Sequence, residues 1–295
     1  MYFLVGLVLL FLVIYSLVVR GIVLNPCKTV YYVIKDLYVY FKFRCWRECP
    51  YGQIISLCGL FGRGKTLSLV KYATLLFSRY NGKMVYCRRR KKWVTQVIKI
   101  YSNVDIVIPH ESFMEMKQIV NVSKMQQKID DENDILTVSL FLGDEFSVQM
   151  NSRSFKTNIS PTLLNTILTC RHHRITLAVS SQRFGHMDAL LRQVTSYVIE
   201  NKKVWRFQCQ YYYDAWDLEN ATNVNLIKPI RRTVWFVKDK DYNAYDTFAC
   251  VSNLEKKCEE GDFISDAEIL AMQASAGSIE NVSNLNRKWK KLHRK

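Results

Sequence analysis

The chain has 295 residues and 49% of them are hydrophobic, so it can form one substantial domain with appendages but not two large domains. Its 42 lysines and arginines outweigh 26 acidic residues, and the net charge of +16 favours an anionic partner such as nucleic acid or an anionic membrane face. The 9 cysteines are scattered, without a dense framework or a paired CxxC zinc spacing, which indicates reduced, cytosolic thiols. Cys45 and Cys49 could suggest a metal half-site, but no matching pair follows, so we interpret them as packing residues.

An uncharged apolar stretch comes first. Residues 1–19 carry no charged side chain, and about 19 to 20 helical residues just span a hydrocarbon core of roughly 30 Å. We therefore predict one transmembrane helix over residues 1–20. A cleaved signal peptide is the alternative, but no basic residue precedes Arg20 and no small-residue cleavage site follows it. The positive-inside bias predicts a single-pass protein of the cytoplasmic membrane with its N-terminus outside, because basic residues follow the span: Arg20, Lys28, Lys35, Lys42, Arg44 and Arg47.

Residues 21–50 form a predicted juxtamembrane segment. Aromatic and basic residues alternate in it, most densely over residues 29–46. This composition suits a segment that lies along lipid headgroups, and it suits equally a helix that connects the span to the next domain.

A phosphate-binding loop follows at residues 59–66, which read GLFGRGKT and match the pattern G-x-x-x-x-G-K-[ST]. The apolar residues 53–58 before it predict a strand, and residues 66–77 after it show a helical pattern. In such a loop backbone N–H groups surround the phosphates, Lys65 reaches the β and γ phosphates, and the Thr66 hydroxyl is a Mg²⁺ ligand. We predict that ATP and Mg²⁺ bind here, to Gly59, Leu60, Phe61, Gly62, Arg63, Gly64, Lys65, Thr66 and Leu67.

The stretch between the loop and the next motif predicts short elements. In chain order these are a turn at 81–82, a strand at 83–87, a basic run at 88–92, short strands at 98–101 and 104–108, a helix at 111–120 and an acidic loop at 130–134. The strand at 83–87 would close a β-α-β unit and so favours a parallel sheet. The basic run is interpreted either as a phosphate-attracting loop or as an exposed connection.

Residues 135–145 are an apolar strand that ends in Asp144 and Glu145, which is the form of a Walker B segment. Asp144 is predicted to bind Mg²⁺ through its water shell, and Glu145 to orient and deprotonate the attacking water. Alone this pattern is weak, because many strands end in acidic residues. Downstream of a phosphate loop it becomes strong.

Ser160 and Pro161 then predict the start of a helix that continues to residue 170, and residues 175–179 predict a buried strand. That strand runs into polar residues 180–183, at the end where open α/β sheets bind ligands. Gln182 is therefore a candidate sensor of the γ-phosphate.

Phosphoryl-transfer enzymes often use an arginine from a neighbouring subunit to neutralise the transition state. Four arginines lie close enough in sequence to qualify, and we favour the first: Arg153, Arg171, Arg174 and Arg183. The neighbouring His172 and His173 are interpreted as a helix end that faces solvent.

The last part of the ATPase region, predicted to span residues 51–250, alternates strand-like segments at 197–202, 204–213 and 232–237. Their mixed aromatic and basic side chains suit stacking on the bases of single-stranded DNA, and for most of them we favour packing of a β extension against the core instead. Residues 251–295 are expected to form a mobile polar tail that ends in a basic run.

Taken together, these motifs resemble the Zot-like (zonula occludens toxin-like) morphogenesis ATPases of filamentous phages, over roughly residues 51–248. The resemblance rests on the phosphate loop, on Leu142-Gly143-Asp144-Glu145, on Asn151-Ser152-Arg153 with Phe155, and on Ser180-Ser181-Gln182-Arg183-Phe184 before Leu191-Arg192. These proteins belong to the FtsK/HerA-type P-loop group, in which a glutamine ends the strand after the Walker B helix, and Gln182 matches that place. In the known members the membrane span follows the ATPase domain, whereas the span predicted here precedes it.

The resemblance implies a P-loop NTPase fold: a mostly parallel sheet flanked by helices, preceded here by one transmembrane helix and followed by a small β-rich extension and a polar tail. It implies a homo-oligomeric ring that uses ATP to assemble and extrude virions through the cytoplasmic membrane of the host, with phage coat protein and single-stranded DNA as partners. The alternative is an FtsK/HerA-type DNA translocase or packaging motor. A third reading, a membrane scaffold that only binds nucleotide, is disfavoured by Glu145 and Gln182.

Overall fold

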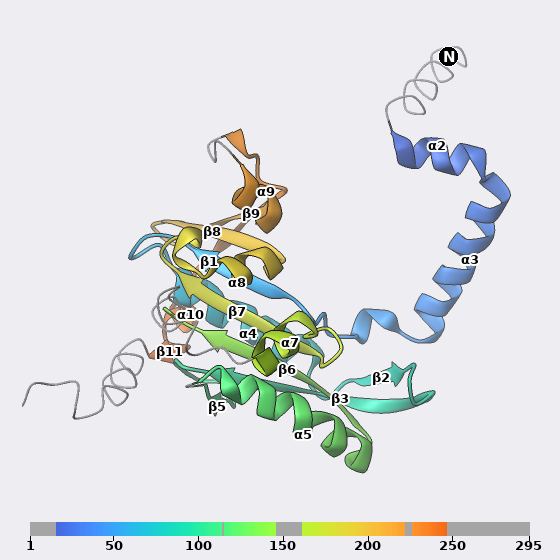
Figure 1. The fold of residues 1–295 in the computed structure, drawn as a ribbon, viewed down its shortest axis with the longest axis horizontal. Helices are drawn as coiled ribbons and strands as arrows, with labels where there is room; N and C mark the ends of the chain where they lie inside the picture. Colours follow the sequence, from blue (N-terminus) through green and yellow to red (C-terminus); the bar gives the residue numbers. More distant parts are fainter. Residues whose placement is uncertain (1–15, 114, 146–160, 222–225, 247–295) are drawn as a thin grey trace, which may run out of the picture. The chain divides into compact units, whose positions relative to one another are not determined.

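The computed structural model of the protein describes residues 16–113, 115–145, 161–221 and 226–246 (Figure 1). The chain divides into two compact units, residues 1–245 and 246–295, and the second unit lies almost wholly outside the described residues. The predicted polar tail over 251–295 falls there. Residues 1–15 of the predicted membrane span are also outside the described part of the chain.

One mixed sheet forms the framework of the first unit. Its central strands run parallel in the order β8-β1-β7-β6-β3. In that order they span Tyr197–Val204, Ile54–Cys58, Ile175–Ser181, Ile135–Gly143 and Lys92–Ser102. Every residue of β1 and β7 is buried, as expected for central strands of a parallel sheet that helices cover on both faces. The predicted α/β fold with a mostly parallel sheet is therefore confirmed.

Antiparallel strands extend both edges of this sheet. On one side β9 (Phe207–Asp214) pairs with β8, and β10 (Arg231–Phe236) pairs with β9. On the other side β2 (Met84–Cys87) pairs with β3. The remaining described strands are short: β4 (Asp105–Ile106), β5 (Glu111–Ser112) and β11 (Tyr245–Asp246). The strands predicted from residue 197 onward are thus present, and the first of them, β8, belongs to the parallel core.

The β2–β3 hairpin corrects the expectation of a β-α-β unit, because β2 runs antiparallel to β3 at the sheet edge. The basic residues 88–91 form its turn, which Lys91 helps to close with a left-handed φ of 52°. β3 is a single strand of 11 residues where only short strands were predicted. Its alternation is obscured in the sequence because Gln96 is buried, where it accepts the Cys49 N–H at 3.0 Å and donates to the Tyr80 carbonyl at 3.0 Å.

The acidic residues near position 130 belong to a helix and not to a loop. Helix α5 spans Lys117–Asn133, beyond the predicted 111–120. Asp130 is fully buried, accepts the Thr137 N–H at 3.1 Å and pairs with Arg174 at 3.2 Å. The negative charge that suggests a solvated loop therefore serves to tie α5 to β6 and to the start of β7.

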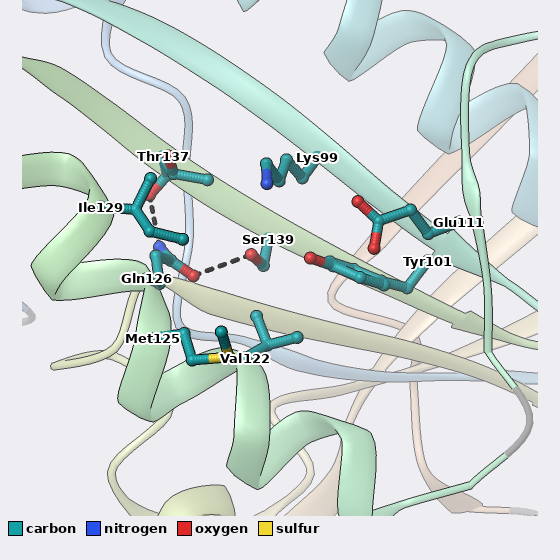
Figure 2. A pocket seen from close by; sticks show the side chains of 9 residues that line it. All are labelled: Lys99, Tyr101, Glu111, Val122, Met125, Gln126, Ile129, Thr137 and Ser139. Atoms are coloured by element: carbon teal, nitrogen blue, oxygen red, sulfur yellow. Dashed lines mark hydrogen bonds between the residues drawn. The ribbon is translucent and has the colours of Figure 1, made fainter. Parts of the chain in front are cut away.

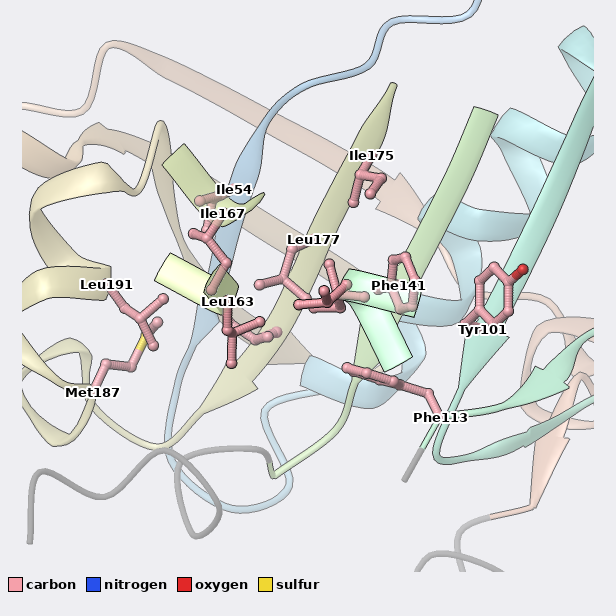
Figure 3. Packing of buried hydrophobic residues seen from close by; sticks show 13 residues of the cluster. Ile54, Tyr101, Phe113, Phe141, Leu163, Ile167, Ile175, Leu177, Met187 and Leu191 are labelled. Atoms are coloured by element: carbon pink, nitrogen blue, oxygen red, sulfur yellow. The ribbon is translucent and has the colours of Figure 1, made fainter. Parts of the chain in front are cut away.

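The other helices in the described part of the domain cover both faces of the sheet. They are α4 (Lys65–Tyr80), α7 (Pro161–Leu168), α8 (Ala189–Val194), α9 (Ala215–Asn220) and α10 (Asp239–Tyr242), with 3-10 turns η1 (Cys45–Arg47) and η2 (Phe184–His186). The core between the sheet, α5 and α7 is centred on Phe141 (Figure 3), whose ring stacks on Tyr101 at 4.5 Å and meets Phe113 edge-on at 5.1 Å. Helix α4 packs on the opposite face, against Ile55 and Leu57.

Within the described residues, two helices precede the domain. Helix α2 (Leu17–Leu24) ends at Asn25, and α3 (Pro26–Lys42) starts at a proline, which lacks the N–H that would continue α2. No residue of α3 is buried. Within the described residues no helix has both the length and the apolar character needed to cross a membrane.

Candidate nucleotide-binding site

The glycine loop leaves the C-terminal end of β1 and enters α4, as predicted. Gly62 and Gly64 have φ of +71° and +76°, a left-handed backbone that side chains rarely adopt. At Gly64 a Cβ atom would also lie 2.4 Å from the Gln208 Oε1, so a side chain there would force the buried Gln208 amide to move. Gly64 is the N-cap of α4 and no side chain caps this helix, so its first N–H groups remain available to an anion.

Lys65 is only 7% exposed. Its ammonium lies 3.4 Å from the Leu60 carbonyl and 5.6 Å from the centre of the Phe61 ring, and within the described residues it forms no ion pair. A buried cation without a counterion is costly, and a phosphate in the loop would remove that cost.

Thr66 and Asp144 meet across the sheet. The Thr66 hydroxyl donates to the Asp144 carboxylate at 2.6 Å, although 78 residues separate them in the chain. Asp144 is held further by Asn103, whose amide donates to the Asp144 carbonyl at 2.8 Å and accepts the Asp144 N–H at 2.7 Å. The predicted pair of metal-binding residues is therefore brought together.

A hydroxyl beside a carboxylate is a set of hard oxygen donors that fits Mg²⁺, which binds one or two protein oxygens together with substrate phosphates. The described residues hold no cluster of three or more His, Cys, Asp or Glu that would suggest a softer or fully caged metal. Tyr245 senses the charge of this site: burial raises the pKa of its hydroxyl, and the negative charge of the nearby Asp144 raises it further.

Glu145 directly follows this pair and has a left-handed φ of 48°. Such a backbone is strained for a residue with a side chain, and strain of this kind concentrates at functional sites. Its N–H donates to the Ser180 hydroxyl at 2.9 Å, and the same hydroxyl donates to the Asp144 carboxylate at 2.5 Å. Ser180 thus links both acidic residues to β7.

Gln182 follows the last residue of β7, the strand that lies between β1 and β6. In the parallel register Ser181 is opposite Cys58, the last residue before the glycine loop, and Val179 is opposite Gly143, just before Asp144. The half-buried Gln182 therefore emerges between the loop and the acidic pair. This is the place predicted for it.

The candidate arginines are placed differently. Arg153, the favoured one, lies outside the described residues. Arg174 precedes β7, at the opposite end of the strand from the glycine loop, and is held by the buried Asp130. Arg171 contacts Gly52, before β1, at that same far end. Of the arginines considered and described, Arg183 lies at the loop end, where it is exposed.

Sequence reasoning missed four residues that shape the site. Ser180 and Asn103 hold the acidic pair, and Asn201 and Gln208, on β8 and β9, lie against the glycine loop. The sequence contains a signal for Ser180, because it is the first of the polar residues at the end of β7. It contains none for Asn103, Asn201 and Gln208, because their place beside the site depends on the strand order.

A separate cavity of about 200 Å³ lies between α5 and strands β3 and β6 (Figure 2). Gln126 in its wall donates to the Thr137 carbonyl at 2.6 Å and accepts the Ser139 hydroxyl at 2.8 Å, which fixes α5 on the sheet. Figure 2 shows Lys99 and Glu111 at its rim. It shares no lining residue with the nucleotide site.

The sheet, the glycine loop and the Thr66–Asp144 pair define a protein of the P-loop NTPase class. No protein-family model and no curated protein match the chain in sequence.

Among solved structures the chain is similar to the N-terminal domain of zonular occludens toxin from Neisseria meningitidis, with 18% identity and a TM-score of 0.43 over 67% of this chain and 100% of that one. It is also similar to the genome packaging NTPase B204 of Sulfolobus turreted icosahedral virus 2 in complex with ATP-gammaS, with 12% identity and a TM-score of 0.37 over 63% and 92% of the two chains. EssC (ATPases 2 and 3) from Geobacillus thermodenitrificans gives 11% identity and a TM-score of 0.36 over 70% and 43%. The function proposed below rests on the site itself.

Proposed function

We propose that the protein is an ATPase that hydrolyses ATP with Mg²⁺. The observation that carries this proposal is the Lys65 ammonium, buried at the N-terminus of α4 without a counterion in the described structure and beside the Thr66–Asp144 pair. If the residue at position 65 served only to pack the core, an apolar side chain would be more stable there, since an uncompensated buried charge is destabilising.

Each residue of the site has a separate task in this proposal. The loop N–H groups and Lys65 bind and orient the phosphates, and Thr66 and Asp144 supply oxygens to Mg²⁺. The ion would neutralise charge that develops on the phosphates. Glu145 orients the attacking water and takes a proton from it, and Gln182 senses the γ-phosphate. Ser180 keeps Asp144 and Glu145 in register by bonding to both.

We further propose attachment to the cytoplasmic membrane, with the ATPase domain on the cytoplasmic side and the span predicted over residues 1–20 as anchor. Helix α3 supports this. Apolar residues exposed by 51 to 63% share one of its faces by their spacing: Val30, Ile34, Leu37 and Phe41. Lysines recur every seven residues on another face: Lys28, Lys35 and Lys42. A helix with one apolar face and a lysine-rich face suits the surface of an anionic membrane.

The process that this ATPase drives is proposed to be assembly and extrusion of filamentous virions, by homo-oligomeric rings that act on phage coat protein and single-stranded DNA. The resemblance of residues 151–153 and 180–184 to the Zot-like group supports it. The translocase alternative shares the same site, and the two differ in what stimulates hydrolysis.

ATP hydrolysis by the full chain, purified in detergent, tests the proposal. The wild type and Lys83→Ala, which changes an exposed lysine just after α4, should hydrolyse ATP only with Mg²⁺. Lys65→Ala and Glu145→Gln should remove the activity, and turnover that survives both substitutions refutes the mechanism. Stimulation by a small hydrophobic coat protein supports virion assembly, whereas strong stimulation by free DNA alone favours a translocase.

A further inference from the structure

The glycine loop is braced from behind by a buried glutamine. Gln208 lies on β9, is fully buried, and donates its Nε2 to the Arg63 carbonyl at 3.0 Å and to the Asn201 Oδ1 at 3.3 Å. Its Oε1 has no hydrogen-bond partner within the described structure and lies 2.4 Å from the place that a Cβ atom at Gly64 would take. An apolar side chain of this size would fill the space without leaving a buried acceptor unpaired, so the amide needs an explanation.

The explanation follows from the planar peptide that joins Arg63 to Gly64. In a trans peptide the carbonyl oxygen and the next N–H lie in one plane and point in opposite directions. Because Gln208 holds the Arg63 oxygen toward β9, the Gly64 N–H is directed away from β9. Within the described residues that N–H donates to no acceptor, so it remains available to a ligand of the loop.

We propose that Gln208 is a positioning residue for nucleotide binding. It fixes the Arg63–Gly64 peptide so that the Gly64 N–H faces the bound phosphates, and it acts only through that peptide. The inference rests on the proposed binding of ATP in this loop. It also accounts for the glycine at position 64, because the close approach of the amide leaves no room for a Cβ atom.

A purely structural role for Gln208, bracing the β8–β9 hairpin, predicts a different result. The hairpin contains a matched residue for this comparison. Gln210 is two positions further along β9, on the same face, and its Nε2 lies 3.5 Å from the same Asn201 Oδ1. It makes no hydrogen bond to the glycine loop in the described structure. Replacing Gln210 removes its contact with Asn201 but leaves the hydrogen bond from Gln208 to the Arg63 carbonyl in place.

The test compares Gln208→Met, which keeps the volume and removes the donor, with Gln210→Met in the full chain in detergent. Binding of a non-hydrolysable ATP analogue with Mg²⁺ is measured by calorimetry, and melting temperature is measured without nucleotide. Gln208→Met should weaken binding about tenfold, the effect expected when one hydrogen bond to a charged group is misdirected. In turnover it should raise KM with little change in kcat, because the contact exists before and during the reaction. Gln210→Met should bind the analogue as the wild type does.

Gln208→Asn provides a second variant that keeps an amide but is one methylene too short to reach the Arg63 carbonyl. It should lose affinity as Gln208→Met does, and it decides the question if the methionine variant does not fold. Folded Gln208 variants with wild-type affinity overturn the inference, and so does an equal loss in Gln210→Met. If the wild-type chain binds no analogue, both the proposed function and this inference fail. If the wild type binds the analogue and the folded Gln208 variants bind it equally well, only this inference fails.

Discussion

Ser180→Ala offers a sharp test of how the acidic pair is held. The Ser180 hydroxyl donates to the Asp144 carboxylate and accepts the Glu145 N–H, and the residue is fully buried. A hydrogen bond to a charged group contributes about 1.5–3 kcal/mol and a neutral one about 0.5–1.5 kcal/mol. If the loss of both bonds lets Glu145 leave its left-handed backbone, we expect kcat to fall about 10- to 100-fold, which corresponds to about 1.4–2.7 kcal/mol.

Steady-state ATP hydrolysis and thermal unfolding of each variant are the measurements. Ser181→Ala is the control, since Ser181 is nearly as buried but its hydroxyl, within the described residues, bonds only to the Arg183 carbonyl, at 2.8 Å. It should keep a nearly normal kcat. A Ser180→Ala protein that is folded and turns over at the wild-type rate would refute the view that this hydroxyl aligns Glu145.

The structure also predicts the outcomes of three further experiments. Asp130→Ala removes a fully buried carboxylate from its pair with the partly buried Arg174 and should cost about 3–5 kcal/mol in urea unfolding. Asp131→Ala removes an exposed carboxylate that pairs with Arg89 and Arg90, and should cost about 0–1 kcal/mol. Burial raises the pKa of the Cys58 thiol to about 11, so at pH 8 it stays protonated and iodoacetamide should label the exposed Cys27 long before it, as followed by mass spectrometry. Leu37→Glu places a charge on the apolar face of α3 and, in a chain that lacks the predicted span over residues 1–20, should weaken binding to anionic vesicles in a flotation assay; unchanged flotation contradicts the proposed role of that face.

Local patterns predicted the parts of the site that have local causes. The glycine loop, the acidic strand end and the polar run after β7 are each set by residues adjacent in sequence, and the structure has all three where they were expected. The strand order is a property of long-range pairing, so the sequence did not predict that β7 separates β1 from β6. Asn103 and Gln208 were not predicted as site residues for this reason, because each reaches the site through a hydrogen bond to a residue far away in the sequence.

Polar residues inside the core caused the other errors. Gln96 interrupts the alternation of β3, and Asp130 makes the end of α5 look like a solvated loop. Both are buried because the fold supplies partners: backbone groups for Gln96, and Thr137 with Arg174 for Asp130. A periodicity argument treats a polar residue as exposed, and it fails wherever tertiary structure satisfies the polar atoms.

The position of β7 gives the strongest reason to include Gln182 in the catalytic set. Side chains alternate between the two faces of a strand, so Ser180 and the residue two positions later point the same way, while Ser181 points the other way. Ser180 reaches Asp144 and Glu145, which identifies its face as the one that carries the acidic pair. If that alternation continues one residue past the end of β7, Gln182 lies on the same face, next to the glycine loop that leads from β1 to Lys65 and next to Glu145, which follows β6. A γ-phosphate held by Lys65 would then meet Gln182 before it met any other side chain of β7, as a sensor of that phosphate requires.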